Sequence, residues 1–200
     1  MGVDFQLLGL MAIYSFVTSV SPGPNNTILL TLSARFGHRG ALPHLFGMVV
    51  GLSVMVIAMS AGLGAFFAAY PAIYEVLKYV GFAYVLYLAW RIYRASVPQP
   101  GDRQGKPTTV WRATLFQWVN PKAWIVIATF VTAYVPIELG AASILIALAM
   151  FIGFTMPGAI VWVFVGTLMA KWFTTPRSQK VFTTVMAVAL VASMVPVLFI

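Results

Sequence analysis

The sequence predicts an all-helical integral membrane protein with six transmembrane helices, arranged as two inverted three-helix repeats in which the first helix of each half is broken. The chain has 200 residues, of which 61% are apolar and 8% charged, and its mean hydropathy is +0.93. A soluble domain is about half apolar and about a quarter charged. The sparse charges leave about six apolar stretches of about 20 residues, which is the length that crosses a bilayer. Proline and asparagine interrupt two of these stretches.

The first apolar stretch, residues 5–32, carries the sequence Ser21-Pro22-Gly23-Pro24-Asn25-Asn26 at its centre. Proline lacks a backbone N–H and clashes with the preceding turn, so a helix does not continue undisturbed through this cluster. Broken backbone at membrane depth is tolerated only inside protein or beside water. A helix that restarts after Pro24 points free N–H groups and a positive dipole end toward the bilayer centre, which suits a carboxylate. A plain proline kink is the alternative, and the density of polar and helix-breaking residues favours a binding site.

The second and third spans follow a short polar connection that contains two glycines. We expect the second span at residues 42–67, closed by a turn at Tyr70 and Pro71. Its Gly47-x-x-x-Gly51 pattern permits close helix packing, and we favour packing within the chain over a homodimer interface, which stays an alternative. The third span is expected at residues 72–93.

The fourth span, residues 112–135, places Gln117, Asn120, Pro121 and Lys122 inside an apolar frame. The fifth is expected at residues 139–170, with an interruption at residues 156–158, where a proline and a glycine stand together. The sixth is expected at residues 181–200. The first stretch is too long for a cleaved signal peptide and has no basic flank, so we expect it to remain as a span.

Basic residues indicate the orientation of these spans. They concentrate in the connections after the first, third and fifth spans, and such residues favour the cytoplasmic side. We therefore expect a multi-pass protein of the bacterial inner membrane with both termini in the periplasm. The net charge of +8 is thereby explained without nucleic acid as a partner. The basic residues of these connections are Arg35, Arg39, Arg91, Arg94, Arg103, Lys106, Arg112, Lys171, Arg177 and Lys180.

Six spans divide into two groups of three, and an odd number per group requires that the two groups insert in opposite orientations. We expect one transmembrane domain over residues 1–200, with repeat one at about 1–94, a cytoplasmic linker at about 95–111 and repeat two at about 112–200. Each repeat opens with a broken span. Interrupted spans at corresponding positions of two halves point to a substrate site between them.

These motifs resemble the LysE/RhtB family of bacterial amino-acid exporters. The resemblance rests on the Ser21–Asn26 cluster, on Gly47-x-x-x-Gly51, and on Asn120-Pro121-Lys122-Ala123. It implies export of amino acids or small derivatives driven by the proton-motive force, with no cofactor. The Pro-Gly-Pro-Asn-Asn form is especially similar to the cysteine and O-acetylserine exporters, while threonine, homoserine and leucine exporters belong to the same family. The resemblance therefore leaves the substrate open.

A free amino acid is a zwitterion, and moving its two charges from water into the membrane is costly unless the protein provides fixed partners for both. The restarted helix offers N–H groups to the carboxylate, the side-chain amides donate and accept, and carbonyls released by the prolines accept from the ammonium. The expected substrate-binding residues are Pro22, Gly23, Pro24, Asn25, Asn26, Gln117, Asn120, Pro121 and Lys122.

Lys122 is the candidate for proton coupling, because desolvation disfavours the charged form of a lysine. A second interpretation is that its side chain extends to the cytoplasmic interface. The histidines His38 and His44 are expected at the cytoplasmic end, as interfacial residues. No Asp or Glu is expected at mid-membrane.

Alternative functions are a passive channel and a membrane-embedded enzyme. A serine protease needs a deep histidine beside its nucleophile, and a metal-dependent transferase needs clustered carboxylates. Neither pattern is present, and the chain has no cysteine for a thiolate metal site or for thiol catalysis. We therefore expect no enzyme activity, no catalytic residues and no metal.

Overall fold

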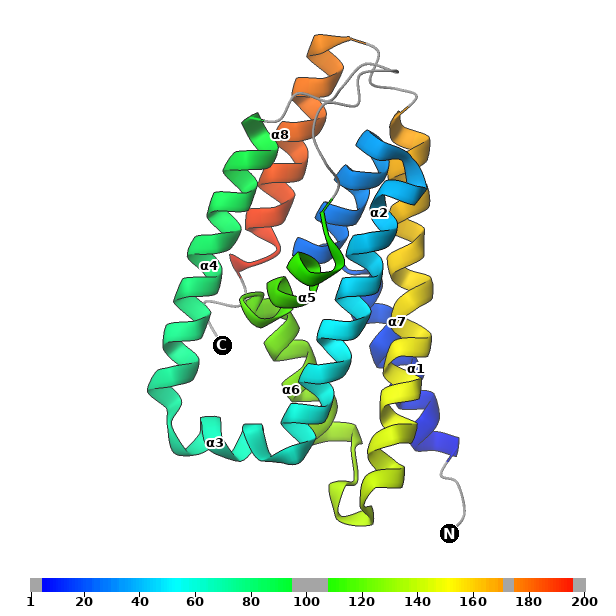
Figure 1. Cartoon of the computed structure of the whole chain (residues 1–200), viewed down its shortest axis with the longest axis vertical. Helices are drawn as coiled ribbons and strands as arrows, with labels where there is room; N and C mark the ends of the chain where they lie inside the picture. The colour runs from blue at the N-terminus through cyan, green and yellow to red at the C-terminus, as the bar shows by residue number, and fades with distance from the viewer. Residues whose placement is uncertain (1–4, 95–107, 171–174, 196–200) are drawn as a thin grey trace.

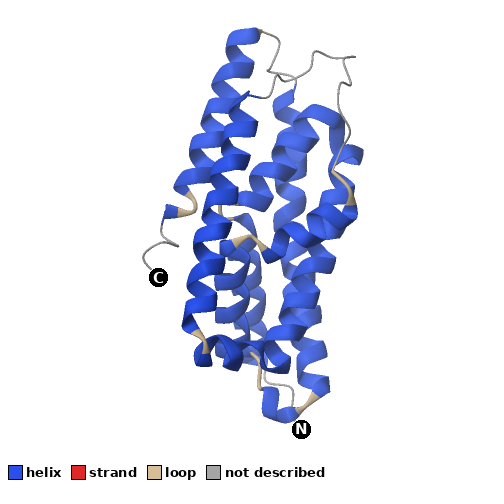
Figure 2. Cartoon of the chain, turned by 60° about the vertical axis from the view of Figure 1, so that its left-hand side comes forward, coloured by secondary structure: helices blue, strands red, loops and turns tan. Residues whose placement is uncertain are grey.

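The computed structural model describes residues 5–94, 108–170 and 175–195, and within these ranges every element is a helix (Figures 1 and 2). The helices form an elongated bundle. Most of the predicted linker lies outside the described residues, and so do Arg103, Lys106 and Lys171. The elements are α1 (Phe5–Val20), α2 (Pro24–Ala58), the π-helical turn η1 (Met59–Leu63), α3 (Gly64–Ala69), α4 (Pro71–Arg94), α5 (Val110–Trp118), α6 (Pro121–Tyr134), the 3-10 turn η2 (Ile137–Leu139), α7 (Ala141–Met169) and α8 (Pro176–Ala192).

The chain reverses direction within the long helix α2. Gly37 has φ 72° and ψ 175°, which is not helical, and it separates residues 24–36 from residues 38–58. A positive φ costs glycine little because it has no Cβ. In Figure 1 the chain rises through α1 and the first part of α2, turns at the upper end, and descends through the second part. The predicted polar connection is thus a tight reversal at one glycine.

The second span, expected at residues 42–67, was predicted to continue beyond the point where the observed α-helix ends. The α-helix ends at Ala58 and passes into the π-helical turn η1, where Gly62 has φ 113°. After this bend, α3 runs across the lower end of the bundle in Figure 1 instead of extending α2. The turn at Tyr70 and Pro71 is present, and α4 begins at Pro71 and runs back up the bundle.

The interruption expected at residues 156–158 is wrong. Helix α7 continues from Ala141 to Met169 with Pro157 inside it. A single proline removes one backbone donor, and membrane helices tolerate this where neighbouring helices pack against them. Gly158 lies against Ser19 at the end of α1, and Gly166 lies against Leu30 of α2, so close contacts hold the part of α7 that follows the proline.

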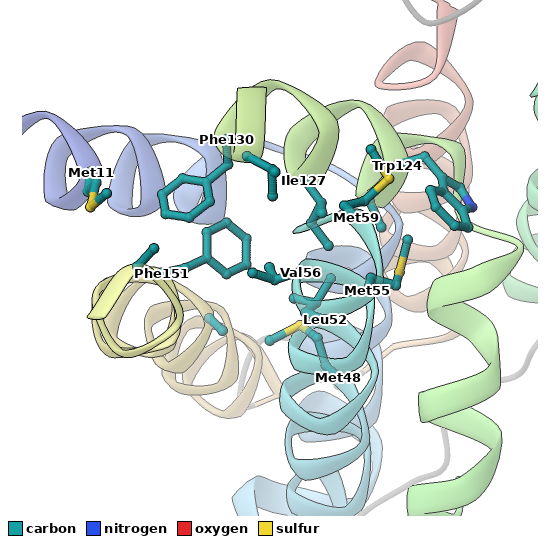
Figure 3. Packing of buried hydrophobic residues seen from close by; sticks show 14 of the residues in the cluster. Met11, Met48, Leu52, Met55, Val56, Met59, Trp124, Ile127, Phe130 and Phe151 are labelled. Carbon is teal, nitrogen blue, oxygen red and sulfur yellow. The ribbon is translucent and has the colours of Figure 1, made fainter. Parts of the chain in front are cut away.

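The main hydrophobic core lies between α1, α2, α6 and α7. Figure 3 shows Phe130 of α6 and Phe151 of α7 facing each other, with their ring centroids 4.7 Å apart. Met11 of α1 and Val56 of α2 belong to the same buried cluster. A second cluster joins α4 to α8 through residues such as Val85 and Leu190. The α4–α8 pair therefore flanks the four helices that carry the main core.

Three described helical stretches are long and apolar enough to cross a membrane. They are Pro24–Ala69, Pro71–Arg94 and Ala141–Met169, with 46, 24 and 29 residues and mean hydropathies of 2.1, 1.3 and 2.3. The protein is therefore a membrane protein. The breaks leave α1, α5 and α6 with 16, 9 and 14 residues, each shorter than the approximately 20 residues that a span needs.

Candidate functional site

The first break lies between α1 and α2, at residues 21–23. Gly23 is fully extended, with φ 178° and ψ 176°, and α2 restarts at Pro24. The first hydrogen bond of the new helix runs from the Thr27 N–H to the Gly23 carbonyl, at 2.9 Å. No side chain caps this N-terminus. The N–H groups of Asn25 and Asn26 precede the first helical bond, so the positive end of the helix dipole is open at this point.

Asn26 holds the first break together. Its side-chain Nδ2 donates to the Ser19 carbonyl at 2.6 Å and to the Ser21 carbonyl at 2.8 Å. These carbonyls belong to the end of α1, where the helix leaves its acceptors without partners. Asn26 is buried. The side-chain amide of Asn26 is therefore occupied by hydrogen bonds within the break.

The second break lies between α5 and α6. Asn120 has φ −93° and ψ 104°, and α6 restarts at Pro121. The Asn120 carbonyl accepts from the N–H of Ala123 at 3.0 Å and of Trp124 at 3.4 Å. Asparagine is among the preferred N-cap residues, yet the Asn120 side chain makes no cap hydrogen bond. Both breaks thus consist of an extended residue followed by a helix that starts with proline.

Lys122 connects the second break to the first. Its Nζ donates to the Pro22 carbonyl at 2.7 Å, to the Ser21 carbonyl at 3.2 Å, and to the Ser21 hydroxyl. A cation is favourable there because the C-terminus of α1 is the negative end of its dipole. The interpretation that Lys122 extends to the membrane interface is wrong in this structure. The carbonyls of Ser21 and Pro22 are therefore occupied by Lys122 in this structure.

Asn25 connects the first break to α5. Its side-chain Nδ2 donates to Gln117 Oε1 at 2.8 Å, and Gln117 Nε2 donates to Asn25 Oδ1 at 3.1 Å. Gln117 Nε2 also donates to the Ala113 carbonyl at 2.9 Å. The two amides therefore form a closed pair between halves of the chain that lie 92 residues apart.

His44 completes this network, and its expected position at the cytoplasmic interface is wrong. It is only 2% exposed, and its Nε2 lies 3.3 Å from Asn25 Oδ1. Because α2 turns back at Gly37, His44 descends into the bundle and shares a helix face with Met48 and Gly51, four and seven residues later. That spacing is the sequence signal that could have placed it in the core.

Gly47 and Gly51 lie against α5. The Thr114 hydroxyl donates to the Gly47 carbonyl at 3.1 Å. A Cβ added to Gly51 would lie 2.5 Å from Gln117 Cγ and 2.8 Å from the Thr114 carbonyl oxygen. The two glycines therefore permit the close approach of α2 and α5 that places Gln117 opposite Asn25.

A cavity lies between the two breaks, with about 60 Å³ of space for water-sized molecules. Both halves of the chain line it, and α7 supplies one wall. Among the residues expected to bind substrate, Pro22, Gln117 and Pro121 do not line it. The lining residues are Thr18, Ser19, Gly23, Pro24, Asn25, Asn26, Met48, Leu52, Asn120, Lys122, Ala123, Val126, Phe151, Thr155 and Ala159.

Two oxygen atoms of this lining have no hydrogen-bond partner within the described residues. They are Oδ1 of Asn120, which is 1% exposed, and Oγ1 of Thr155, which is 7% exposed. Burying a polar atom without a partner is costly. Thr155 on α7 was not expected from the sequence, because a threonine in an apolar helix commonly bonds to its own backbone.

Among the described residues, those that line the cavity provide donors of positive character and no carboxylate. Two helix N-termini and the Lys122 ammonium meet at it, and neither Glu75 nor Glu138 is among its lining residues. Glu75 instead pairs with Lys78 at 2.8 Å. Within the described ranges, no group of His, Asp and Glu side chains is arranged to hold a metal ion. The site is therefore suited to a molecule with an anionic group that also offers hydrogen-bond donors to neutral oxygens.

Residues 16–198 match the LysE type translocator family. The chain belongs to this family. It is 28% identical to the cysteine/O-acetylserine efflux protein of Escherichia coli (strain K12) over 169 residues, which cover 84% of this chain and 86% of that protein. It is 30% identical to the cysteine/O-acetylserine efflux protein of Salmonella typhi over 171 residues, with the same coverage of the two chains. No solved structure gives a significant match.

The family assignment confirms the resemblance drawn from the two proline clusters. The match covers both breaks and all the residues that line the cavity between them. As a LysE type translocator, the protein is a transport protein of the membrane.

Proposed function

We propose that this protein is a secondary active exporter of small neutral amino acids or their derivatives across the bacterial inner membrane. The observation that carries the proposal is the cavity at which two interrupted helices from different halves of the chain present their N-termini, with Asn120 and Thr155 left unpaired in its wall. Interrupted helices at a repeat interface are typical of substrate sites in secondary transporters.

The substrate carboxylate is proposed to bind at the N-termini of α2 and α6. There the free N–H groups of Asn25 and Asn26 offer donors, and the Lys122 ammonium adds its positive charge to the field of the helix N-termini. The substrate ammonium is proposed to bind to neutral oxygens, because none of the described lining residues carries a carboxylate. An acidic substrate side chain needs a second cationic partner, whereas a basic one needs an anionic partner. The residues that line the cavity therefore suit a neutral substrate side chain better than an acidic or a basic one.

The relatives named as cysteine/O-acetylserine efflux proteins support a small polar amino acid as substrate. Threonine, homoserine and leucine remain alternatives on the basis of the family resemblance. The small volume of the cavity favours the smaller members of this series.

We propose a single domain over residues 1–200 with six spans in two inverted repeats. In this arrangement α1 with the first part of α2, and α5 with α6, form the two broken spans. The packing supports it, because the second part of α2 lies against α5 through Gly47 and Gly51, while α7 lies against α1 and α2 through Gly158 and Gly166. The second span of each half thus packs on the broken span of the other half, and the third spans, α4 and α8, pack together.

The proposed orientation places the upper end of Figure 1 in the cytoplasm and both termini in the periplasm. The reversal of α2, the end of α4 and the start of α8 lie at the upper end, and α5 begins below them, nearer the middle of the bundle. Described basic residues gather in these segments, which is the pattern expected for cytoplasmic loops. They are Arg35, Arg39, Arg91, Arg94, Arg112, Arg177 and Lys180.

We propose that export is coupled to protons and that Lys122 is the proton-coupling residue. An ammonium has three N–H donors, and Lys122 has three acceptors at Ser21 and Pro22. Loss of a proton leaves two donors, so deprotonation weakens the contact between the two breaks. A homodimer through an outer helix face remains compatible with this arrangement, since Gly47 and Gly51 are occupied within the chain.

Counterflow in proteoliposomes tests the proposed function. The purified protein is reconstituted with one unlabelled amino acid inside, and uptake of the same labelled amino acid is followed for serine, cysteine, O-acetylserine, threonine, homoserine and leucine. We expect saturable counterflow of at least one of them, and accumulation against a gradient when a pH difference is imposed. Flux without saturation or accumulation would identify a passive channel, and hydrolysis or transfer without flux would identify an enzyme.

A further inference from the structure

Asn120 and Thr155 come from different helices of the second half of the chain and line the same cavity, and both carry a buried oxygen atom without a partner in the described structure. Asn120 precedes α6 directly, and Thr155 lies in the middle of α7. Two such atoms in one small cavity point to polar groups of a ligand as their missing partners, because unpaired buried oxygens are otherwise destabilising.

The Thr155 hydroxyl is unusual among the threonines of this bundle. The hydroxyls of Thr18, Thr31 and Thr167 each donate to the carbonyl four residues earlier in their own helix, at 2.7 to 3.0 Å. Thr155 makes no such bond. Its neighbours on the same helix face, Phe151 and Ala159, are apolar and also line the cavity. The Thr155 hydroxyl is thus a single polar group in an otherwise apolar wall.

Asn120 Oδ1 differs from the Thr155 hydroxyl because it only accepts hydrogen bonds. It is next to Pro121 and Lys122, at the N-terminus where the carboxylate is proposed to bind. In an amino acid the ammonium and the carboxylate are attached to the same carbon, so the ammonium is held close to any group that binds the carboxylate. Asn120 Oδ1 is therefore positioned to accept a hydrogen bond from the substrate ammonium. The Thr155 hydroxyl is then available to the substrate side chain.

We infer that Thr155 is a specificity-determining residue that selects amino acids with a hydroxyl, thiol or ester group on the β-carbon, while Asn120 Oδ1 accepts a hydrogen bond from the α-ammonium of every substrate. This inference rests on the proposed function as an amino-acid exporter. A site built to hydrogen-bond a substrate group discriminates strongly against an analogue that lacks it, since its buried polar group is then left unpaired. An apolar wall without Thr155 has no such means of discrimination.

The test compares two pairs of amino acids whose members differ in one group, serine with alanine and cysteine with 2-aminobutyrate. The kcat/KM for counterflow is measured for each member in proteoliposomes. We expect the wild-type protein to prefer the polar member of each pair by at least about tenfold, which corresponds to one retained hydrogen bond. In Thr155→Val, which replaces the hydroxyl by a methyl group, we expect the preference to fall to about twofold or less, whereas Thr155→Ser retains it.

Thr167→Val is the matched control, because Thr167 lies on the same helix, bonds to Val163 and does not line the cavity. It should keep the wild-type preference. Asn120→Ala should lower kcat/KM for all four amino acids by a similar factor and leave the ratios unchanged. Thr155→Ala provides a second variant without a hydroxyl.

The outcomes separate this inference from the function on which it rests. If the wild-type protein shows no counterflow of any amino acid, the proposed function fails and the inference fails with it. If the wild-type protein transports amino acids but does not distinguish the members of either pair, or if Thr155→Val and Thr155→Ala keep the preference, only the inference is overturned. A wild-type protein that transports amino acids without the preference overturns the inference even where a variant does not fold.

Discussion

Replacing Gly51 by alanine should separate α2 from α5 and loosen the contact between the two breaks. A Cβ on Gly51 would lie 2.8 Å from the Thr114 carbonyl oxygen, whereas ordinary contacts begin at 3.4 Å. The oxygen belongs to the helix backbone and cannot rotate away. The two helices must therefore move apart by about 0.6 Å, the difference between these two distances.

Two energetic consequences follow from this displacement. Overpacking of a well-packed contact costs about 1 to 3 kcal/mol. The hydrogen bonds between Asn25 and Gln117, now 2.8 and 3.1 Å long, lengthen when α5 moves, and each contributes about 1 kcal/mol. Alanine regains up to about 1 kcal/mol through its higher helix propensity. The net loss is about 1 to 3 kcal/mol, or a decrease in Tm of about 2 to 12 °C for a chain of this size.

Thermal unfolding of the purified protein in detergent measures this loss, with Gly153→Ala as the control. Gly153 is a helical glycine of α7, and a Cβ there would meet nothing within 4 Å. We expect the Tm of Gly153→Ala to equal or exceed that of the wild-type protein. If Gly51→Ala unfolds at the same temperature as Gly153→Ala, the close approach of α2 and α5 does not hold the site together and the reasoning is refuted.

Three further predictions concern the breaks and the reversal of α2. Lys122→Met should reduce transport at least about tenfold, since it removes hydrogen bonds from a charged donor, and any residual export in vesicles should no longer depend on the pH gradient; a retained dependence would exclude Lys122 as the proton-coupling residue. Asn25→Ala and Gln117→Ala should show a coupling energy of about 1 to 2 kcal/mol in a double-mutant cycle on unfolding, and strictly additive effects would argue against the amide pair. Gly37→Ala should destabilise the protein by about 1 to 2 kcal/mol because φ is 72°, whereas Gly9→Ala, which meets no neighbour, should not.

The positions of the two breaks could be predicted from the sequence because the cause is local. Pro24 and Pro121 each follow a residue that leaves the helix, and each is the first residue of the next helix. The expectation that a proline interrupts a helix was wrong at Pro157, where the preceding residues stay helical. Whether a proline breaks a helix or is absorbed by it depends on the neighbouring helix, and the sequence does not identify that neighbour. The bend at Gly62 was missed for a similar reason, since a glycine in an apolar stretch is compatible with a straight helix.

The hydrogen-bond partners of the polar side chains were harder to predict from the sequence than the positions of the breaks. Asn25 and Asn26 are adjacent and chemically identical, yet one bonds to Gln117 of α5 and the other closes the end of α1. Their roles differ because successive residues of a helix point in different directions. His44 and Thr155 were missed because their burial depends on packing between distant parts of the chain.

Asn25 and Lys122 occupy the same position in the two broken spans, directly after the proline that starts a helix. The side chain of each crosses to the other half, Asn25 to α5 and Lys122 to the end of α1. The two crossings differ in chemistry. The amide pair is neutral and its hydrogen bonds are satisfied internally, whereas Lys122 is a cation held by carbonyl and hydroxyl oxygens. A carboxylate is a stronger acceptor for an ammonium than a neutral oxygen is. A substrate carboxylate in the cavity would therefore compete for Lys122 and leave the amide pair intact, so substrate binding would loosen one connection between the halves and not the other.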